Sequence, residues 1–298
     1  MTKSNTPQAA LTIAATDSGG GAGVAADLRS LAAHGVHGTL AVTAVTAQDT
    51  VGLRSLFLLP AQLVADQIDA VTADIAPRSC KTGMLGSPET LEVVLERVAS
   101  GALPPALVVD PVLVSSSDAP LFPPDQMASL VAGYRTLLRS STVVTPNLPE
   151  AALLSGRRVG TLSDMEAAAR DLHELGPSLV VVKGGRLRGF GAGTDIAFDG
   201  AAVSHLSGPF VKTRNVHGTG CSFSAAIAAL LALGSDPLRA AIAAKRFVRE
   251  ATARSADWRL GEGHGPIDHL DLPARRAEAE QRLAGVSQGA AAGTEGGP

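Results

Sequence analysis

This 298-residue sequence has few aromatic residues and no excess of positive charge. Aromatic side chains make up 3% of the chain, too few for the stacking platforms with which many proteins bind single-stranded nucleic acid. Lysine and arginine number 25 against 28 acidic residues, which gives a net charge of −3. Nucleic-acid-binding domains carry a basic patch or stripe instead. We therefore expect no nucleic-acid partner.

Cysteines and long apolar runs are scarce as well. The two cysteines, Cys80 and Cys221, are far apart and have no CxxC spacing. This excludes a disulfide framework or a structural zinc site and favours a reducing compartment. Charges and glycines interrupt the apolar runs well below the length of a membrane span, and the first residues lack the apolar core of a signal peptide. The sequence predicts a cytoplasmic protein without a membrane partner.

What the sequence does have is a hydrophobic content of 45% and short apolar runs that alternate with helical patterns. This alternation predicts a mostly parallel sheet covered by helices. We expect strands at 11–15, 38–47, 53–59, 79–84, 107–110, 142–145 and 179–182, and an edge hairpin at 194–199 and 202–206. Helices are expected at 24–33, 63–73, 88–98, 124–138, 162–175 and 222–233. The domain division expected is a flexible lead (1–10), one domain (11–284) and a disordered tail (285–298).

Several of the expected strands are followed by polar residues. These are Asp17, Asp110, the segment 145–147 and Lys183. In open parallel sheets, ligands bind beyond the carboxyl ends of the strands. The sequence therefore predicts a binding site at that edge of the sheet.

The segment from Asn215 to Cys221, Asn-Val-His-Gly-Thr-Gly-Cys, runs directly into an alanine-rich helical pattern. Glycines allow backbone N–H groups to come close to a ligand, and the first N–H groups of a helix have no partner inside it. The helix dipole adds positive charge there, so the loop suits a phosphate. The alternative is an ordinary glycine turn before a buried helix. His217 is interpreted as a satisfied loop residue without a catalytic role.

A second glycine-rich segment, residues 17–23, opens an earlier helix. It fits neither a Walker A loop nor the GxGxxG fingerprint. It is either a flexible turn or a loop against which a small molecule lies, with Asp27 as a hydrogen-bond partner from the helix. Gln48 follows the next strand, and its amide could pair with the donor and acceptor edge of an aminopyrimidine. The alternative is that Gln48 is simply solvated.

Three further residues allow two interpretations each. Glu150 forms a capping box with Asn147, or it orients magnesium-bound water near phosphates. Lys183 reaches a phosphate, or it extends to the surface. Cys221 is a thiol made more acidic by the start of a helix, or a small buried apolar residue.

Taken together and in order, these segments resemble the hydroxymethylpyrimidine/phosphomethylpyrimidine kinases of thiamine biosynthesis, in the ribokinase-like superfamily. The likeness spans roughly residues 11–270. The matching segments are Thr-Asp-Ser-Gly-Gly-Gly-Ala-Gly at 16–23, Ala-Asp-Leu at 26–28, Thr-Ala-Val-Thr-Ala-Gln at 43–48, Lys-Thr-Gly-Met-Leu at 81–85, Asp-Pro-Val at 110–112, Thr-Pro-Asn-Leu-Pro-Glu-Ala at 145–151, Val-Lys-Gly-Gly at 182–185, His-Gly-Thr-Gly-Cys at 217–221 and Gly-Glu-Gly-His-Gly-Pro-Ile at 261–267.

The resemblance implies a three-layer α/β/α sandwich with a mostly parallel central sheet, and a homodimer. It implies ATP and Mg²⁺ as cofactors. The residues implied for the pyrimidine acceptor are Gly21, Asp27, Gln48, Met84 and Val112. Those implied for ATP are Lys183, Gly185, Thr213, Gly218 and Gly220. Those implied for magnesium are Asp110, Asn147 and Glu150. The catalytic set comprises Lys183, Gly218, Thr219, Gly220 and Cys221.

The activity implied is phosphorylation of 4-amino-5-hydroxymethyl-2-methylpyrimidine by ATP and then of its monophosphate. We also expect an apolar wall of Val45, Met84 and Val112 in the acceptor pocket. Ribokinase relatives usually carry a general-base aspartate where this chain and the pyrimidine kinases carry Cys221. The sequence departs mildly from the family pattern at Ala15, Ala25 and Asp49. A pyridoxine or pyridoxal kinase, and a nucleotide- or pyrimidine-sensing protein without turnover, remain alternatives.

Overall fold

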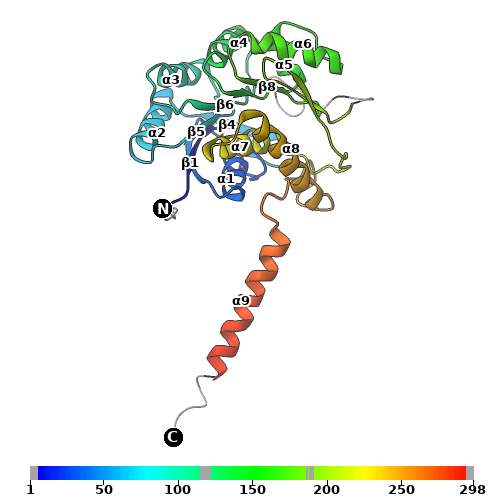
Figure 1. Cartoon of the computed structure of the whole chain (residues 1–298). Helices are drawn as coiled ribbons and strands as arrows, with labels where there is room; N and C mark the ends of the chain where they lie inside the picture. The colour runs from blue at the N-terminus through cyan, green and yellow to red at the C-terminus, as the bar shows by residue number, and fades with distance from the viewer. Residues whose placement is uncertain (1–5, 115–121, 186, 188–190, 293–298) are drawn as a thin grey trace, which may run out of the picture.

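The computed structural model describes residues 6–114, 122–185, 187 and 191–292, with side chains described as far as residue 282. Its centre is an eight-stranded sheet in the order β10-β9-β8-β7-β6-β5-β1-β2 (Figure 1). The strands are β1 (Ala9–Ala14), β2 (His37–Val42), β5 (Ser79–Thr82), β6 (Ala106–Val109), β7 (Val143–Val144), β8 (Leu179–Val182), β9 (Asp195–Phe198) and β10 (Val203–Leu206).

In the series β2-β1-β5-β6-β7-β8, each strand is parallel to the next. β9 runs antiparallel to both β8 and β10, which confirms the predicted hairpin at the sheet edge. All four residues of β5 and of β8 are buried, as expected for parallel strands that are covered on both faces.

Helices cover the two faces of the sheet in separate groups. Val109 and Val144 belong to the apolar cluster of one face, and the preceding residues Val108 and Val143 belong to the cluster of the other. This alternation is the two-residue period of a strand. The predicted three-layer α/β/α sandwich is therefore confirmed. One face carries α2 (Ala61–Asp74), α3 (Pro88–Ala99), α4 (Pro124–Leu138), α5 (Leu148–Ser155) and α6 (Leu162–His173), and the other carries α1 (Gly23–Ala33), α7 (Thr219–Ala232) and α8 (Pro237–Arg254).

The alanine-rich sequence of α7 lets this helix lie directly on the sheet. The hydroxyl of Ser79 on β5 donates to the carbonyl of Ala228 at 2.7 Å, and the residues from Ser222 to Ala229 are all buried. Small side chains allow this close approach, which fixes where α7 begins relative to the strand ends. The start of α7 is therefore positioned by packing along its whole length.

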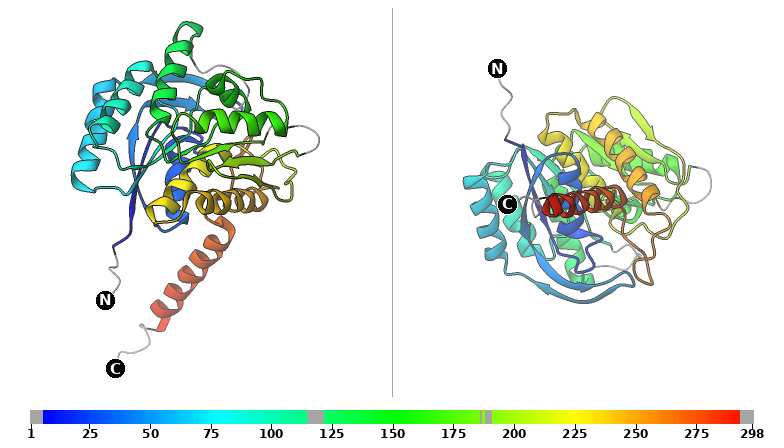
Figure 2. Two further views of the ribbon diagram at one scale, coloured as in Figure 1. Left: turned by 45° about the horizontal axis from the view of Figure 1, so that its top comes forward. Right: turned by 90° about the horizontal axis from the view of Figure 1, so that it is seen from below.

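A two-stranded antiparallel sheet, β3 (Ala44–Gln48) with β4 (Leu53–Leu58), lies outside the main sheet and curves along the rim of the molecule (Figure 2). The prediction of one strand over 38–47 is wrong here. The main-sheet strand ends at Val42, and Thr43 N–H donates to Ala14 O at 3.1 Å before the chain turns outward. The apolar run continues across this break, so hydrophobicity alone does not reveal it.

Two helices lie near the C-terminus that the sequence analysis did not predict. Asp236 caps α8, and its side chain accepts hydrogen bonds from the N–H groups of Leu238 and Arg239. Helix α9 (Leu272–Ala292) projects from the body (Figure 1). It continues past residue 284, where an irregular tail was expected, and residues 293–298 lie outside the described part.

At the other end, β1 already begins at Ala9, within the expected lead, and residues 1–5 lie outside the described part. The division into lead, domain and tail stays a prediction. None of the helices in the described residues has the length and apolar character needed to cross a bilayer.

Candidate active site

The polar residues that follow the parallel strands meet at one edge of the main sheet. Lys183 Nζ lies 2.7 Å from Asp110 Oδ1. The hydroxyl groups of Thr145 and Ser224 donate to the Asp110 carboxylate at 3.3 and 3.0 Å. Asn147 forms a parallel bridge with Lys183. The predicted convergence of these strand ends is confirmed.

The loop Gly218–Cys221 opens α7 beside this cluster. Within the described part of the chain, the N–H groups of Gly220 and Cys221 have no acceptor. Lys183 Nζ lies 3.4 Å from the position that a Cβ of Gly220 would occupy. Free N–H groups at the positive end of a helix, next to an ammonium group, form a favourable environment for a phosphate.

Asp17 organises the first glycine-rich loop and joins it to the second. Its carboxylate accepts hydrogen bonds from the N–H groups of Gly19, Gly21 and Ala22 at 2.9, 3.0 and 2.8 Å. His217 Nε2 lies 2.8 Å from Asp17 Oδ2. Burial raises the pKa of Asp17, but the hydrogen bond to His217 and the N–H donors bring it below its ordinary value. Asp17 is therefore an ionised link between the two loops.

Gln48 reaches the same histidine from the end of β3. Gln48 Nε2 lies 3.4 Å from His217 Nε2, and a Cβ on Gly21 would lie 2.4 Å from His217 Cδ2. His217 is thus a partnered loop residue, as expected. It also connects Gln48 to the glycine loops, which the sequence did not indicate.

Cys221 is not the acidic thiol that its position at a helix start favours. Burial raises the pKa of Cys221 to about 11; Lys81 lowers it, while Asp27 and Asp110 raise it further. The N–H of Gly23 donates to its sulfur. At neutral pH the group is therefore a thiol, and the expectation of increased acidity is wrong.

Asp27 is completely buried below the first glycine loop. Its Oδ2 accepts hydrogen bonds from Lys81 Nζ at 2.8 Å and from the Thr12 hydroxyl at 2.6 Å. Its Oδ1 is buried and has no hydrogen-bond partner among the described residues. Burial lowers the pKa of Lys81, but Asp27 outweighs it and raises the pKa above its ordinary value. The sequence analysis named Asp27 but missed that Lys81 is its cationic partner. Asp27 and Lys81 are each a charged residue within an otherwise apolar pattern, and this was the signal that could have revealed the pair.

The residues expected to form the apolar wall do not all come together. Met84 and Val112 are half-buried and follow β5 and β6, and the carbonyl of Met84 accepts a hydrogen bond from Thr43 at 2.7 Å. Val45 is 48% exposed and lies opposite Phe57 in the β3–β4 pair. The buried residues on either side of Val45 face the body. Val45 therefore points away from the pocket, and its assignment to the wall is wrong.

The residues implied for ATP lie along two loops. Lys183 and Gly185 follow β8, and no atom of the described residues lies within 4 Å of the position that a Cβ of Gly185 would take. Thr213 precedes the α7 loop. Its hydroxyl donates to Ala256 O at 2.8 Å and accepts from Asn215 N–H at 3.0 Å. Thr213 thus orders the approach to the loop with both hydrogen-bonding functions of its hydroxyl.

The residues implied for magnesium already have protein partners. Asn147 and Glu150 form a complete capping box at the start of α5, so the structural interpretation of this pair is confirmed. Burial raises the pKa of Glu150 to about 8, with Lys183 lowering it and Asp110 raising it. In the described ranges, no group of three or more His, Cys, Asp or Glu side chains could hold a metal ion directly.

His269, which follows α8 in the chain, contacts the first turn of α7. The Ser222 hydroxyl lies 2.7 Å from His269 Nε2. Burial lowers the pKa of His269 to about 4, and Arg29 lowers it as well. His269 is therefore a neutral ring that binds the first turn of α7, a contact that no sequence pattern indicated.

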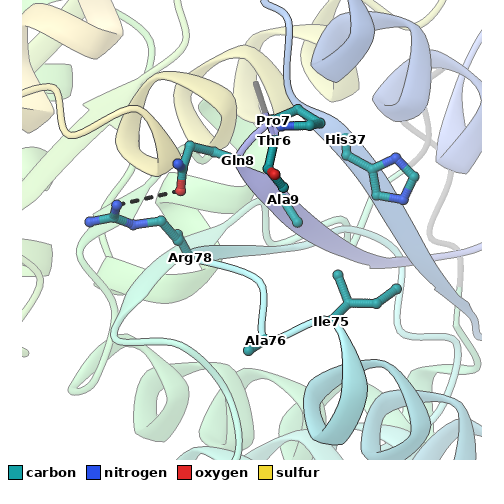
Figure 3. A pocket seen from close by; sticks show the side chains of 8 residues that line it. All are labelled: Thr6, Pro7, Gln8, Ala9, His37, Ile75, Ala76 and Arg78. Atoms are coloured by element: carbon teal, nitrogen blue, oxygen red, sulfur yellow. Dashed lines mark hydrogen bonds between the residues drawn. The ribbon is translucent and has the colours of Figure 1, made fainter. Parts of the chain in front are cut away.

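Two hollows in the described part of the chain lie away from this cluster. One of about 580 Å³ lies at the opposite end of β1 (Figure 3), where Arg78 donates to Gln8 Oε1 at 3.4 Å and His37 faces them. Another, of about 250 Å³, borders the first glycine loop and is lined by Arg29 and Trp258 among others. Neither includes the loop Gly218–Cys221.

Known proteins are similar to this chain over most of its length. The family model described as phosphomethylpyrimidine kinase matches residues 17–268. A hydroxymethylpyrimidine/phosphomethylpyrimidine kinase of Synechococcus elongatus is 45% identical over 261 residues, which is 88% of this chain and 97% of that protein. A chloroplastic thiamine biosynthetic bifunctional enzyme of Arabidopsis thaliana is also 45% identical, over 87% of this chain; the chain spans about half (49%) of that longer protein.

Solved structures show the same fold. The phosphomethylpyrimidine kinase of Clostridium difficile superimposes with a TM-score of 0.71 at 35% identity, over 82% of this chain and 99% of that one. A pyridoxal kinase of Bacillus subtilis in complex with ADP gives 0.80 at 33% identity, over 90% and 100%. Sequence motifs, site geometry and these similarities agree, and the chain belongs to the phosphomethylpyrimidine kinase family.

Proposed function

We propose that the protein transfers the γ-phosphoryl group of ATP to the hydroxymethyl oxygen of 4-amino-5-hydroxymethyl-2-methylpyrimidine, and then a second phosphoryl group to the monophosphate. The observation that carries this proposal is that free backbone N–H groups and a lysine ammonium lie together at the start of α7. The unpartnered N–H groups of Gly220 and Cys221 lie beside the ammonium of Lys183. The names of the sequence relatives support the choice of acceptor.

In the transfer, the bond between the bridging oxygen and the γ-phosphorus breaks as the hydroxymethyl oxygen bonds to that phosphorus, and ADP leaves. Negative charge spreads over the oxygens of the transferring group. The N–H groups of the Gly218–Cys221 loop and the Lys183 ammonium stabilise this charge without having to reorganise. We assign these residues to transition-state stabilisation.

Cys221 does not act as the base in this scheme. Its pKa of about 11 keeps the sulfur protonated at neutral pH. A loose transition state leaves the proton on the attacking oxygen until late, so little general-base assistance is needed. The proton then passes to solvent or to a phosphate oxygen. Cys221 contributes its backbone N–H and fills the space below the loop.

The residues present fit magnesium that arrives with the nucleotide and keeps most of its water. Among the described residues, Asp110, Asn147 and Glu150 form no direct ligand cluster. They follow β6 and β7, at the edge of the sheet where the phosphates would lie. Magnesium commonly keeps several waters and uses few protein carboxylates. The bound ion would neutralise phosphate charge, and these side chains would orient its water shell.

Acceptor recognition is assigned to Gln48, with Met84 and Val112 as apolar neighbours. The Gln48 amide is held near His217 at the mouth of the two glycine loops, where it can pair with the ring nitrogen and amino group of the pyrimidine. Asp27 is fully buried, so we assign it to support the loop from behind together with Lys81. Direct contact of Asp27 with the acceptor would need the loop to open.

The test is a coupled assay of ADP release with magnesium-ATP and each acceptor: the hydroxymethylpyrimidine, its monophosphate, pyridoxine and pyridoxal. We expect turnover with both pyrimidines, and a time course in which monophosphate forms before diphosphate. Efficient turnover with pyridoxal alone would establish the vitamin B6 kinase instead. Tight binding without turnover of any acceptor would establish a sensor.

We further propose a homodimer in the cytoplasm. The outer face of the β3–β4 pair is apolar and uncovered, with Val45 and Phe57 opposite each other and 48% and 67% exposed. An uncovered apolar sheet face of this kind favours association. Sedimentation analysis should give a dimer for the wild-type protein and a monomer for Phe57→Asp; a monomeric wild-type protein would refute the dimer.

A further inference from the structure

The turn that carries Lys183 is closed at its base by a buried carboxylate. The chain leaves β8 as Lys183-Gly184-Gly185 and returns to the sheet at Asp195, the first residue of β9. Asp195 Oδ1 accepts a hydrogen bond from Gly184 N–H at 2.8 Å. Asp195 is 4% exposed, so this bond is shielded from water.

The second oxygen of the same carboxylate is bound by a lysine of helix α8. Lys245, on α8, lies 2.8 Å from Asp195 Oδ2 and 2.7 Å from the carbonyl of Gly193. The side chain of Lys245 is only 22% exposed. One ammonium group therefore joins α8 to two positions at the start of the returning strand.

The backbone at this point leaves little space for other arrangements. A Cβ on Gly184 would lie 1.8 Å from Thr194 O, and Gly193 N–H donates to Gly184 O at 3.2 Å. Lys183 N–H donates to Pro146 O at 2.8 Å. The outgoing and returning strands of the turn are thus fixed to each other and to the strand end of β7.

We propose that the Asp195–Lys245 ion pair positions the nucleotide-binding turn: Asp195 holds the Gly184 peptide, and Lys245 holds Asp195, so that Lys183 and Gly185 meet the phosphates in a fixed place. This inference rests on the proposed function, because it takes Lys183 and Gly185 as nucleotide contacts. Neither Asp195 nor Lys245 touches the reacting atoms. They are positioning residues.

One observation distinguishes this role from simple stabilisation. The two oxygens of Asp195 serve different segments, one the turn and one the helix, so the carboxylate transmits the position of α8 to Gly184. A buried ion pair contributes little to stability compared with apolar residues of similar size, and its value lies in the geometry that it fixes. Charge-assisted hydrogen bonds are short and directional, which suits this purpose.

The experiment compares Lys245→Met, Lys245→Arg and Asp195→Asn with the wild-type enzyme. A fluorescent ADP analogue gives the nucleotide Kd without turnover, and the coupled assay gives KM for ATP and for the pyrimidine. We expect Lys245→Met and Asp195→Asn to weaken nucleotide binding by about tenfold, and up to ~10²-fold where the turn moves by an ångström. KM for the pyrimidine should stay near its wild-type value, and Lys245→Arg should recover most of the nucleotide affinity.

Arg246→Met is the matched control, because Arg246 is the next residue on α8 and its pair with Glu250 is exposed. It should leave both constants unchanged. In the double variant Asp195→Asn/Lys245→Met, the lysine substitution should add little, since its partner is already neutral. The proposal is overturned if Lys245→Met keeps wild-type nucleotide affinity, or if both KM values rise equally. If the wild-type protein phosphorylates no pyrimidine, the proposed function fails, while the nucleotide Kd still decides this inference.

Discussion

In the loop before α7, Gly218→Ala should abolish most of the activity, whereas Gly220→Ala should not. Gly218 has φ +79°, and a Cβ there would lie 1.8 Å from Gly21 O. Among the described residues, a Cβ on Gly220 would meet no backbone atom within 4 Å and would lie 3.4 Å from Lys183 Nζ, the end of a long side chain that has to shift by only a few tenths of an ångström. Gly218→Ala and Gly220→Ala thus form a matched pair within one loop.

The magnitude follows from two contributions. A left-handed backbone costs an alanine about 1–2 kcal/mol, and the contact with Gly21 O forces one of the two glycine loops to move. Displacing an N–H donor from a developing oxyanion costs about 10²–10³ in kcat. The change in stability corresponds to a decrease in Tm of about 2–4 °C per kcal/mol for a domain of this size. The protein should therefore stay folded while losing its turnover.

The assay is kcat for the pyrimidine, measured alongside circular dichroism and thermal unfolding. We expect Gly218→Ala to keep its secondary structure and lose at least about 10²-fold in kcat, and Gly220→Ala to remain close to wild type. Gly220→Val, whose branched side chain also meets Lys183, should lose turnover. Near-normal turnover of Gly218→Ala would refute the assignment of this loop to the transferring phosphoryl group.

Other consequences of the site can be tested separately. Gln48→Ala should raise KM for the pyrimidine by about tenfold or more, as expected for lost hydrogen bonds, and leave KM for ATP unchanged. Gln62→Ala, at an exposed position of α2, is the control. Equal effects of Gln48→Ala on both constants would contradict the assignment. Cys221→Ser should retain most of the activity with the same pH profile between pH 6 and 9, because the thiol pKa is about 11; a large loss with a shifted profile would restore the general-base role. The pKa of His269 is lowered to about 4 in the folded protein. As the pH falls, His269 therefore takes up a proton in the unfolded chain before it does so in the folded one. The contribution of His269 to stability is complete above about pH 6.5 and is lost as the pH falls towards 4. Urea unfolding at pH 7 and 5 should show this loss, and His269→Gln should reduce it.

The parallel sheet and its polar edge could be predicted because they depend on local patterns. Short apolar runs that end in Asp110 and Lys183 define both the strands and the site, and parallel strands bring their carboxyl ends together whatever the loops do. The glycine loop before α7 was predictable for the same reason. Its free N–H groups follow from where a helix begins.

The remaining features depend on contacts that sequence spacing does not encode. The break at Thr43 lies inside a continuous apolar run, and the outward direction of Val45 follows from that break. The high pKa of Cys221 results from burial and from two carboxylates on other elements, which override the local effect of the helix start. The partners of Asp195 and Ser222 come from segments about 50 residues away in sequence, so only the folded chain reveals them.

The position of Gln48 on the β3–β4 arm has an evolutionary consequence. The arm is hydrogen-bonded within itself and to the first glycine loop, through Thr46 with Thr16 and through Gln48 with Ser18. Lys183 and Asp110 instead follow strands of the main sheet. We therefore expect changes in acceptor preference to arise first by substitutions on this arm, at a distance from the strands that carry the proposed phosphate contacts.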